Sequence, residues 1–144
     1  MILTMNGTDK AIKCRGWTLL EMMIVLLVMA VLVAIAYPAY NSHLIKTRRA
    51  DGKALLYQAA QREQQFFTTN SAFTETIGTG GLSMSTSSGE GYYTLSIVAT
   101  ATTYTLTATR AGPQTDDSGC GELTLTHLGA RGISGGSLSA DKCW

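Results

Sequence analysis

The sequence predicts an α+β fold in which a long N-terminal helix, apolar in its first half, packs on a small antiparallel β-sheet. Three observations lead to this expectation. Residues 17–37 form an almost unbroken apolar run, residues 40–67 repeat apolar side chains at helical spacing, and three later segments alternate apolar and polar residues. A sheet packed on the amphipathic half of the helix is the simplest way to bury both apolar faces.

Length and charge narrow the classes of function. The chain has 144 residues, which suits one domain of ordinary size. Its formal net charge is +1, so it lacks the broad basic field that is typical of nucleic-acid binders. No second apolar run of membrane-spanning length follows Tyr40.

The apolar run 17–37 is long enough to cross a bilayer and has three interpretations. It could be a plain signal anchor, or a secretory signal peptide cut near Ala36 in the segment AIAYPAY. The third interpretation places a cut before the run, between Gly16 and Trp17. Only the third explains Glu21, because that cut creates a positive amine about one helical turn away, and the amine can neutralise the carboxylate. An unpaired carboxylate in a membrane helix costs about 2.5–3.5 kcal/mol.

The segment RGWTLLEMMIVLLVMAVLVAIAYPAY resembles the class III leader and N-terminal helix of type IV pilins and pseudopilins. The resemblance implies that a prepilin peptidase cuts after Gly16 and methylates the new N-terminus at Trp17. It also implies that Glu21 faces the N-terminal amine during docking into a filament. Trp17 is a departure, since phenylalanine is usual at that position, whereas Pro38 stands where pilins commonly place a proline that loosens the helix.

We expect one helix from Trp17 to about Thr68. Past Tyr40 its apolar residues recur at helical spacing, at Leu44, Leu55, Leu56, Ala59, Ala60, Phe66 and Phe67. Charged and amide side chains lie between them, namely Lys46, Arg48, Arg49, Asp51, Lys53, Gln58, Gln61, Arg62 and Glu63. Bends or local melting are expected at Pro38 and Gly52, because proline removes a backbone hydrogen bond and glycine is permissive.

The remainder of the chain reads as a loop, three strands and an irregular tail. Residues 68–91 are rich in glycine, serine and threonine, which is typical of a loop. Residues 92–99, 103–109 and 121–128 alternate apolar residues with polar ones, mostly threonine, as strands buried on one side do. Residues 129–144 are glycine-rich, and we expect them to be irregular.

The cysteine count favours an oxidising compartment. Of the three cysteines, Cys14 lies in the leader and is lost on cleavage, which leaves Cys120 and Cys143 as a pair. A disulfide between them would hold the glycine-rich tail against the sheet, and closing such a loop is worth about 3 kcal/mol. A disulfide-bounded C-terminal loop, the D-region, is also what the resemblance to pilins implies.

The segment TYTLTATRAGPQTDDSGCGELTLTHLGARG and the final CW resemble the C-terminal half of PilE-type minor pilins. The resemblance implies a type IV pilin fold in three parts. Residues 1–16 are a leader peptide that is removed, residues 17–40 are an apolar transmembrane and filament-core helix, and residues 41–144 are a periplasmic or extracellular globular domain. It implies a structural pilin subunit, more like a minor than a major one.

That resemblance also implies a location, partners and a role. The subunit would cross the inner membrane once before assembly and then become part of the extracellular pilus. Its partners would be major and minor pilin subunits, the prepilin peptidase, the inner-membrane assembly platform and, before assembly, the membrane. Twitching motility, adhesion or surface sensing would be the role of the filament.

No enzyme activity, cofactor or metal site is expected. The chain contains no H-E-x-x-H, G-x-S-x-G, P-loop or paired C-x-x-C motif. Asp116 and Asp117 could form half of a calcium site, but further carboxylates at the EF-hand spacing are missing. We therefore expect a solvated turn before the disulfide.

Two other functions stay open. A pseudopilin of a type II secretion system shares the leader and helix, but its family typically holds the tail with calcium, and the Cys120 and Cys143 pair argues against it. A DNA-binding minor pilin would need a basic patch. The basic residues cluster close to the membrane end of the helix, where subunits or lipid headgroups are the expected partners, at Lys46, Arg48, Arg49 and Lys53. The D-region offers only Arg131 and Lys142 against Asp141, so nucleic acid is disfavoured as a partner.

Overall fold

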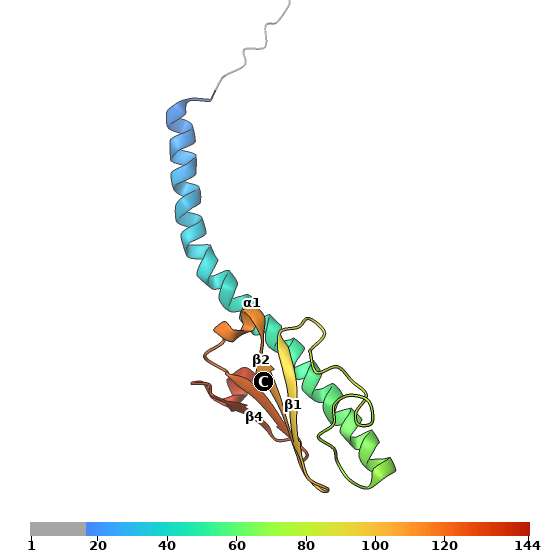
Figure 1. Cartoon of the computed structure of the whole chain (residues 1–144). Helices are drawn as coiled ribbons and strands as arrows, with labels where there is room; N and C mark the ends of the chain where they lie inside the picture. Colours follow the sequence, from blue (N-terminus) through green and yellow to red (C-terminus); the bar gives the residue numbers. More distant parts are fainter. Residues whose placement is uncertain (1–16) are drawn as a thin grey trace, which may run out of the picture. The chain divides into compact units, whose positions relative to one another are not determined.

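The computed structural model describes residues 17–144 of the chain (Figure 1). The predicted leader over residues 1–16, including Cys14 and Gly16, lies outside the described residues. The chain divides into two compact units, Met1–Pro38 and Ala39–Trp144, and each is described by itself.

Helix α1 extends from Leu19 to Asn70, within two residues of the predicted ends. The part up to Pro38 belongs to the first unit, and its side chains are exposed. One 18-residue window of α1 has a mean hydropathy of 2.9 and none of it is buried, so by length and composition this segment could cross a membrane. Pro38 and Gly52 both lie inside α1, and the bends expected there stay predictions.

The second unit contains a four-stranded antiparallel sheet in the order β1-β2-β3-β4. The strands are β1 (Tyr93–Ala99), β2 (Tyr104–Arg110), β3 (Glu122–Thr126) and β4 (Arg131–Ser134). One apolar row crosses the sheet, from Leu95 to Ala108, then Leu123 and Ile133, as successive cross-strand partners. The three predicted strands are confirmed. The expectation that residues 129–144 are irregular was wrong for β4, which forms because Ile133 continues this row, and for the short helix α2 (Ala140–Cys143).

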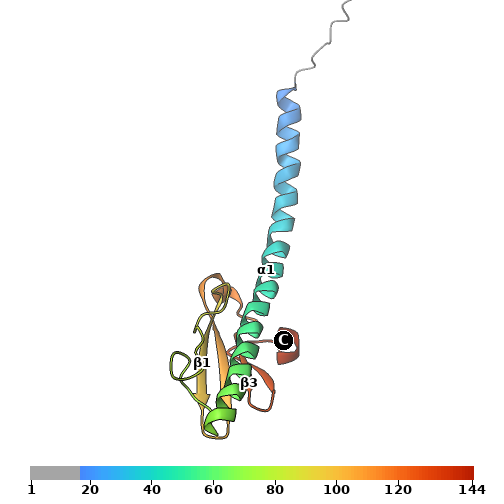
Figure 2. The same ribbon diagram turned by 90° about the vertical axis from the view of Figure 1, so that its right-hand side faces the viewer.

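The core lies between the sheet and the C-terminal half of α1, which Figures 1 and 2 show side by side. Leu55, Leu56 and Ala59 are the helix residues at its centre. They meet the inward-facing residues of the strands, which are Tyr93, Leu95, Tyr104, Leu106, Ala108, Leu123 and Leu125. The sheet therefore packs on the amphipathic half of the helix, as predicted.

Gly52 lets the Tyr93 ring approach the helix axis. A Cβ atom on Gly52 would lie 2.8 Å from Cδ2 of Tyr93. Real Cβ atoms do not come so close to a ring carbon, so at this position the absence of a side chain creates the space that the buried tyrosine fills.

Two of the charged residues that lie between the apolar positions of α1 are buried. Arg49 is 8% exposed and Glu63 is fully buried. Both lie on the same helical stripe as Gly52, Leu56 and Ala59, since the spacing between successive members is three or four residues. The stripe that faces the sheet is therefore polar at both ends and apolar in its centre.

Residues 71–92 connect α1 to the sheet and contain one isolated bridge, between Ser87 and Thr94. Phe73 anchors the start of this connection by packing between Phe67 of the helix and Tyr104 of β2, with ring centroids 4.6 and 4.8 Å away. The connection thus lies against both layers of the domain, as the loop prediction requires.

Candidate functional site

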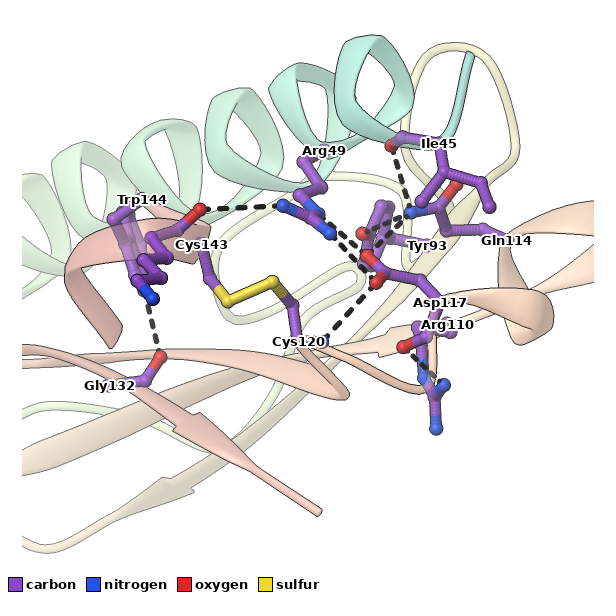
Figure 3. Close-up of a disulfide and its surroundings, with 11 residues drawn as sticks. Ile45, Arg49, Tyr93, Arg110, Gln114, Asp117, Cys120, Gly132, Cys143 and Trp144 are labelled. Carbon is purple, nitrogen blue, oxygen red and sulfur yellow. Dashed lines mark hydrogen bonds and ion pairs between the residues drawn. A yellow bond between two sulfur atoms is a disulfide. The ribbon is translucent and has the colours of Figure 1, made fainter. Parts of the chain in front are cut away.

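The disulfide of the D-region joins Cys120, just before β3, to Cys143 in α2 (Figure 3). The two Cα atoms are 5.5 Å apart, and the cysteines are 23 residues apart in sequence. Both side chains are buried in the core. The predicted pairing of Cys120 with Cys143 is confirmed.

An ion pair between α1 and the D-region lies beside the disulfide. Nε of Arg49 donates to Oδ2 of Asp117 at 2.7 Å, and Nη2 donates to Oδ1 at 2.9 Å, so the contact is bidentate (Figure 3). A third Arg49 donor, Nη1, reaches the backbone carbonyl of Lys142 at 3.5 Å. One helix residue thus binds both segments that the disulfide joins.

Gln114, in the 3-10 helix Gly112–Asp116, links the same ion pair to the core. Its Nε2 atom lies 3.2 Å from the carbonyl oxygen of Ile45, 3.1 Å from the hydroxyl of Tyr93 and 3.1 Å from Oδ2 of Asp117. Gln114 is fully buried, and its amide group shares two N–H donors among these three oxygens, whereas its Oε1 has no partner among residues 17–144.

The expected solvated turn before the disulfide was wrong for Asp117, although Asp116 is exposed as expected. Burial alone would raise the pKa of Asp117. Hydrogen bonds from Arg49 and from the backbone N–H of Cys120, together with the charges of Arg49 and Arg110, outweigh burial and lower this pKa. Asp117 is therefore an ionised structural residue. Within residues 17–144 no group of three or more metal-ligating side chains comes together.

The N-terminus of α1 has its own polar contact, between Thr18 and Glu21. Oγ1 of Thr18 accepts a hydrogen bond of 3.2 Å from the backbone N–H of Glu21. The segment Thr-Leu-Leu-Glu has the spacing of a capping box, in which the first side chain satisfies a donor that the first helical turn leaves free. Glu21 thus also marks the third position of a helix start, a signal that the sequence contains but that we had not used.

The basic residues that cluster in the sequence are separated in the structure. Arg49 forms the internal ion pair, and Lys46 is exposed on the helix. Arg48 instead stacks over the ring of Tyr92, with Cζ 4.9 Å from the centroid. This stack lines a surface hollow of about 400 Å³ that also contains the carboxylates of Asp51 and Glu90. Arg49 is therefore not available to lipid headgroups or other subunits. For the other three basic residues of the cluster, such contacts stay a prediction.

A second group, which we call the cationic–aromatic patch, consists of Lys53, Tyr57, Arg131 and Trp144. The rings of Tyr57 and Trp144 meet edge to face, with centroids 6.0 Å apart. Cζ of Arg131 lies 5.9 Å from the Tyr57 centroid and 5.7 Å from that of Trp144. The indole Nε1 donates to the carbonyl of Gly132 at 2.8 Å, which fixes Trp144 against β4 (Figure 3). No pattern in the sequence indicates this grouping, because its residues come from three separate parts of the chain.

Comparisons with known proteins find two matching family models and a similar solved structure. Residues 38–124 match the family model described as type IV minor pilin ComP, DNA uptake sequence receptor. Residues 12–37 match the model of the prokaryotic N-terminal methylation motif. Among solved structures, a type IV pilin from Shewanella oneidensis is 27% identical, with 60% of this chain and 89% of that chain covered and a TM-score of 0.45.

Proposed function

The chain belongs to the type IV minor pilin family of ComP, and on this premise we propose that it is held in the inner membrane, cut between Gly16 and Trp17, and then built into a type IV pilus. The match of residues 12–37 to the N-terminal methylation motif is the observation that carries this proposal. Under it, residues 1–16 are removed, residues 17–40 form the membrane and filament-core segment, and residues 41–144 form the exported domain.

The exposure of the first half of α1 supports both stages of this life cycle. No residue from Trp17 to Pro38 is buried, although most of them are apolar. Exposing such a surface to water is unfavourable, because burying one large apolar side chain contributes about 1.5–3 kcal/mol of free energy. The surface therefore requires an apolar partner. Lipid would cover it before assembly, and the helices of neighbouring pilins would cover it in the filament.

Glu21 would act at the step between these two stages. After the cut, Trp17 carries a positive amine, which the peptidase would methylate. Glu21 is exposed and has no ion-pair partner among residues 17–144, so its carboxylate is available to the amine of a neighbouring subunit. Pairing would remove the cost of placing either charge among apolar helices.

The mass of the protein in sheared filaments tests this proposal. We expect a species that begins at Trp17, carries one methyl group on the amine and contains the oxidised Cys120–Cys143 pair. A low copy number relative to another pilin is expected for a minor subunit. A chain that retains residues 1–16 in the filaments, or a processed chain that is absent from them, would contradict assembly after cleavage.

A Glu21→Gln variant separates assembly from processing. Glutamine keeps the backbone N–H that Thr18 caps and removes only the negative charge. We expect normal cleavage after Gly16 but loss of the protein from sheared filaments. Equal incorporation of the variant and the wild type would show that the charge of Glu21 has no role in docking.

DNA uptake is the second candidate function, and the ComP family description favours it. The order of charges along the sequence counts against DNA, but the fold places Lys53 of the helix close to Arg131 of β4, which the sequence did not predict. Binding of a fluorescent DNA duplex to the full chain in a non-ionic detergent tests this function. Affinity should fall steeply as salt rises, because neutralised phosphates release counterions. The absence of binding at low salt would exclude it.

A further inference from the structure

The guanidinium of Arg131 is held against two rings and keeps its hydrogen-bond donors free. Arg131 is exposed, and its side chain makes no hydrogen bond or ion pair to any of residues 17–144. Its position within 6 Å of both ring centroids restrains its plane. A planar fork with five restrained and unused donors is suited to a bidentate anion such as a phosphate.

Lys53 adds a second positive charge to the same place. It precedes Tyr57 by one helical turn, so the two side chains lie on one face of α1. Partial burial lowers the pKa of Lys53, and the charges of Arg49 and Arg131 lower it further. The ammonium therefore lies in the field of two guanidinium groups, of which only that of Arg49 is neutralised by a carboxylate.

This excess of positive charge is unusual for the domain. Arg49 and Arg110 are used internally, since Arg110 donates to the carbonyl oxygens of Thr115 and Asp117 at 3.1 and 2.7 Å. Arg48 also stacks on a ring, but the carboxylates of Asp51 and Glu90 line the same hollow. In the cationic–aromatic patch a stacked arginine lies near a lysine, and neither is in an ion pair with any of residues 17–144.

We infer that the cationic–aromatic patch is a DNA-contact site in which Lys53 and Arg131 bind backbone phosphates and the rings of Tyr57 and Trp144 position Arg131. This inference rests on the DNA-uptake function proposed above and assigns that function to specific residues. The two cations neutralise two phosphates, whereas the rings hold the guanidinium plane so that little conformational entropy is lost on binding. The disulfide at Cys143 ties α2, which precedes Trp144, to the start of β3 and so helps to position the indole.

A pair of charge-matched double variants tests the assignment. Lys53→Ala with Arg131→Ala removes two positive charges from the patch, and Arg48→Ala with Arg62→Ala removes two from other positions on α1. The full chain in non-ionic detergent is titrated into a fluorescein-labelled DNA duplex of about 20 base pairs, which is roughly two helical turns. The titration is repeated over a series of salt concentrations, and unfolding midpoints confirm that both variants are folded.

The patch variant should lose affinity by about 10- to 100-fold near 0.1 M salt. Its plot of log K against log salt should become shallower by about 1.8, or 0.9 for each lost phosphate contact. The control variant should keep the wild-type slope. Equal losses in both double variants, with wild-type binding intact, would overturn the assignment to this patch but leave DNA binding standing. No binding by the wild type at low salt would overturn DNA uptake itself.

A Tyr57→Leu variant separates positioning from simple charge. Leucine covers the same surface but cannot stack with a guanidinium. We expect weaker DNA binding with an unchanged salt slope, because both cations remain. A wild-type affinity in this variant would overturn the positioning role of the ring.

Discussion

Arg49 and Asp117 lie 68 residues apart in sequence and form the ion pair that fixes the D-region to helix α1, with Nε and Oδ2 2.7 Å apart. Their side chains are 10% and 2% exposed. The same arginine reaches the carbonyl of Lys142, next to the disulfide. The covalent bridge closes the D-region on itself, whereas this ion pair connects it to the rest of the domain.

Replacing Arg49 should therefore destabilise the domain strongly. An Arg49→Ala variant leaves the Asp117 carboxylate buried without its counter-charge, which costs about 3–5 kcal/mol. Thermal or urea unfolding of the purified chain measures the effect. Lys46→Ala, an exposed change on the same helix, should alter the free energy of unfolding by no more than about 0.5 kcal/mol. Similar values for the two variants would contradict a structural role for the ion pair.

The same pair makes the stability of the domain sensitive to acid. The pKa of Asp117 is lowered in the folded chain, so its contribution is fully present above the usual value of 3.8 and is lost as the pH falls through the lower folded pKa. We expect the midpoint temperature of thermal unfolding to fall as the pH is lowered below about 4. In an Asp117→Asn variant this drop should be smaller, because the side chain cannot titrate. An identical acid profile in both proteins would assign the loss to other carboxylates.

Glu63 should show the opposite dependence on pH. It is fully buried, and among residues 17–144 its Oε1 has no hydrogen-bond partner and its Oε2 accepts only from the backbone N–H of Thr74, at 3.2 Å. Burial raises its pKa above 4.5, and the Thr74 hydrogen bond offsets this only in part. The folded state therefore favours the protonated acid, and this contribution to stability is present at low pH and is lost as the pH rises through the folded pKa.

A Glu63→Gln variant tests this directly. Glutamine resembles the protonated acid in shape and stays neutral, so the variant should unfold at a higher temperature than the wild type at pH 7. The difference should shrink as the pH falls through the raised folded pKa toward 4.5, and it should not change further below that value. A variant that is less stable than the wild type at pH 7 would show that the buried carboxylate is favourable in its ionised form.

Gly52 offers a test in which two effects oppose each other. Alanine is better than glycine inside a helix by about 1 kcal/mol, but a Cβ here would lie 2.8 Å from the Tyr93 ring. Crowding a well-packed core costs about 1–3 kcal/mol, so we expect Gly52→Ala to lower the free energy of unfolding by about 1 kcal/mol. Chemical denaturation measures the sign. A more stable variant would mean that the tyrosine ring can move aside and that the higher helix propensity of alanine prevails.

Local periodicity explains which parts of the fold the sequence predicts. The helix and the first three strands repeat apolar residues with the correct period, so each can be identified from its own residues. Strand β4 has only four residues and includes Gly132, and it forms because β3 presents a free edge beside it. No pattern within Arg131–Ser134 indicates that edge.

The candidate sites depend even more on distant parts of the chain. Two pairs become neighbours only when α1 lies on the sheet, namely Arg49 with Asp117 and Lys53 with Arg131. A pattern within one segment does not specify such pairs. One signal was available, because Arg49 and Glu63 occupy the helical stripe that also contains Leu56 and Ala59. A charged residue on an apolar stripe indicates a buried partner.

The two edge strands of the sheet determine whether neighbouring domains can pair their strands. An open strand edge invites pairing with another sheet, and the risk is high where many similar domains stand side by side, as pilins do. At one edge, β1 is covered by its own preceding loop, through hydrogen bonds from Ser88 N to Tyr93 O and from Leu95 N to Thr86 O. At the other edge, β4 is short, and the indole N–H of Trp144 donates a hydrogen bond to the carbonyl of Gly132. Backbone groups at both edges are thus already hydrogen-bonded, which disfavours strand exchange between neighbouring domains that are packed at high density.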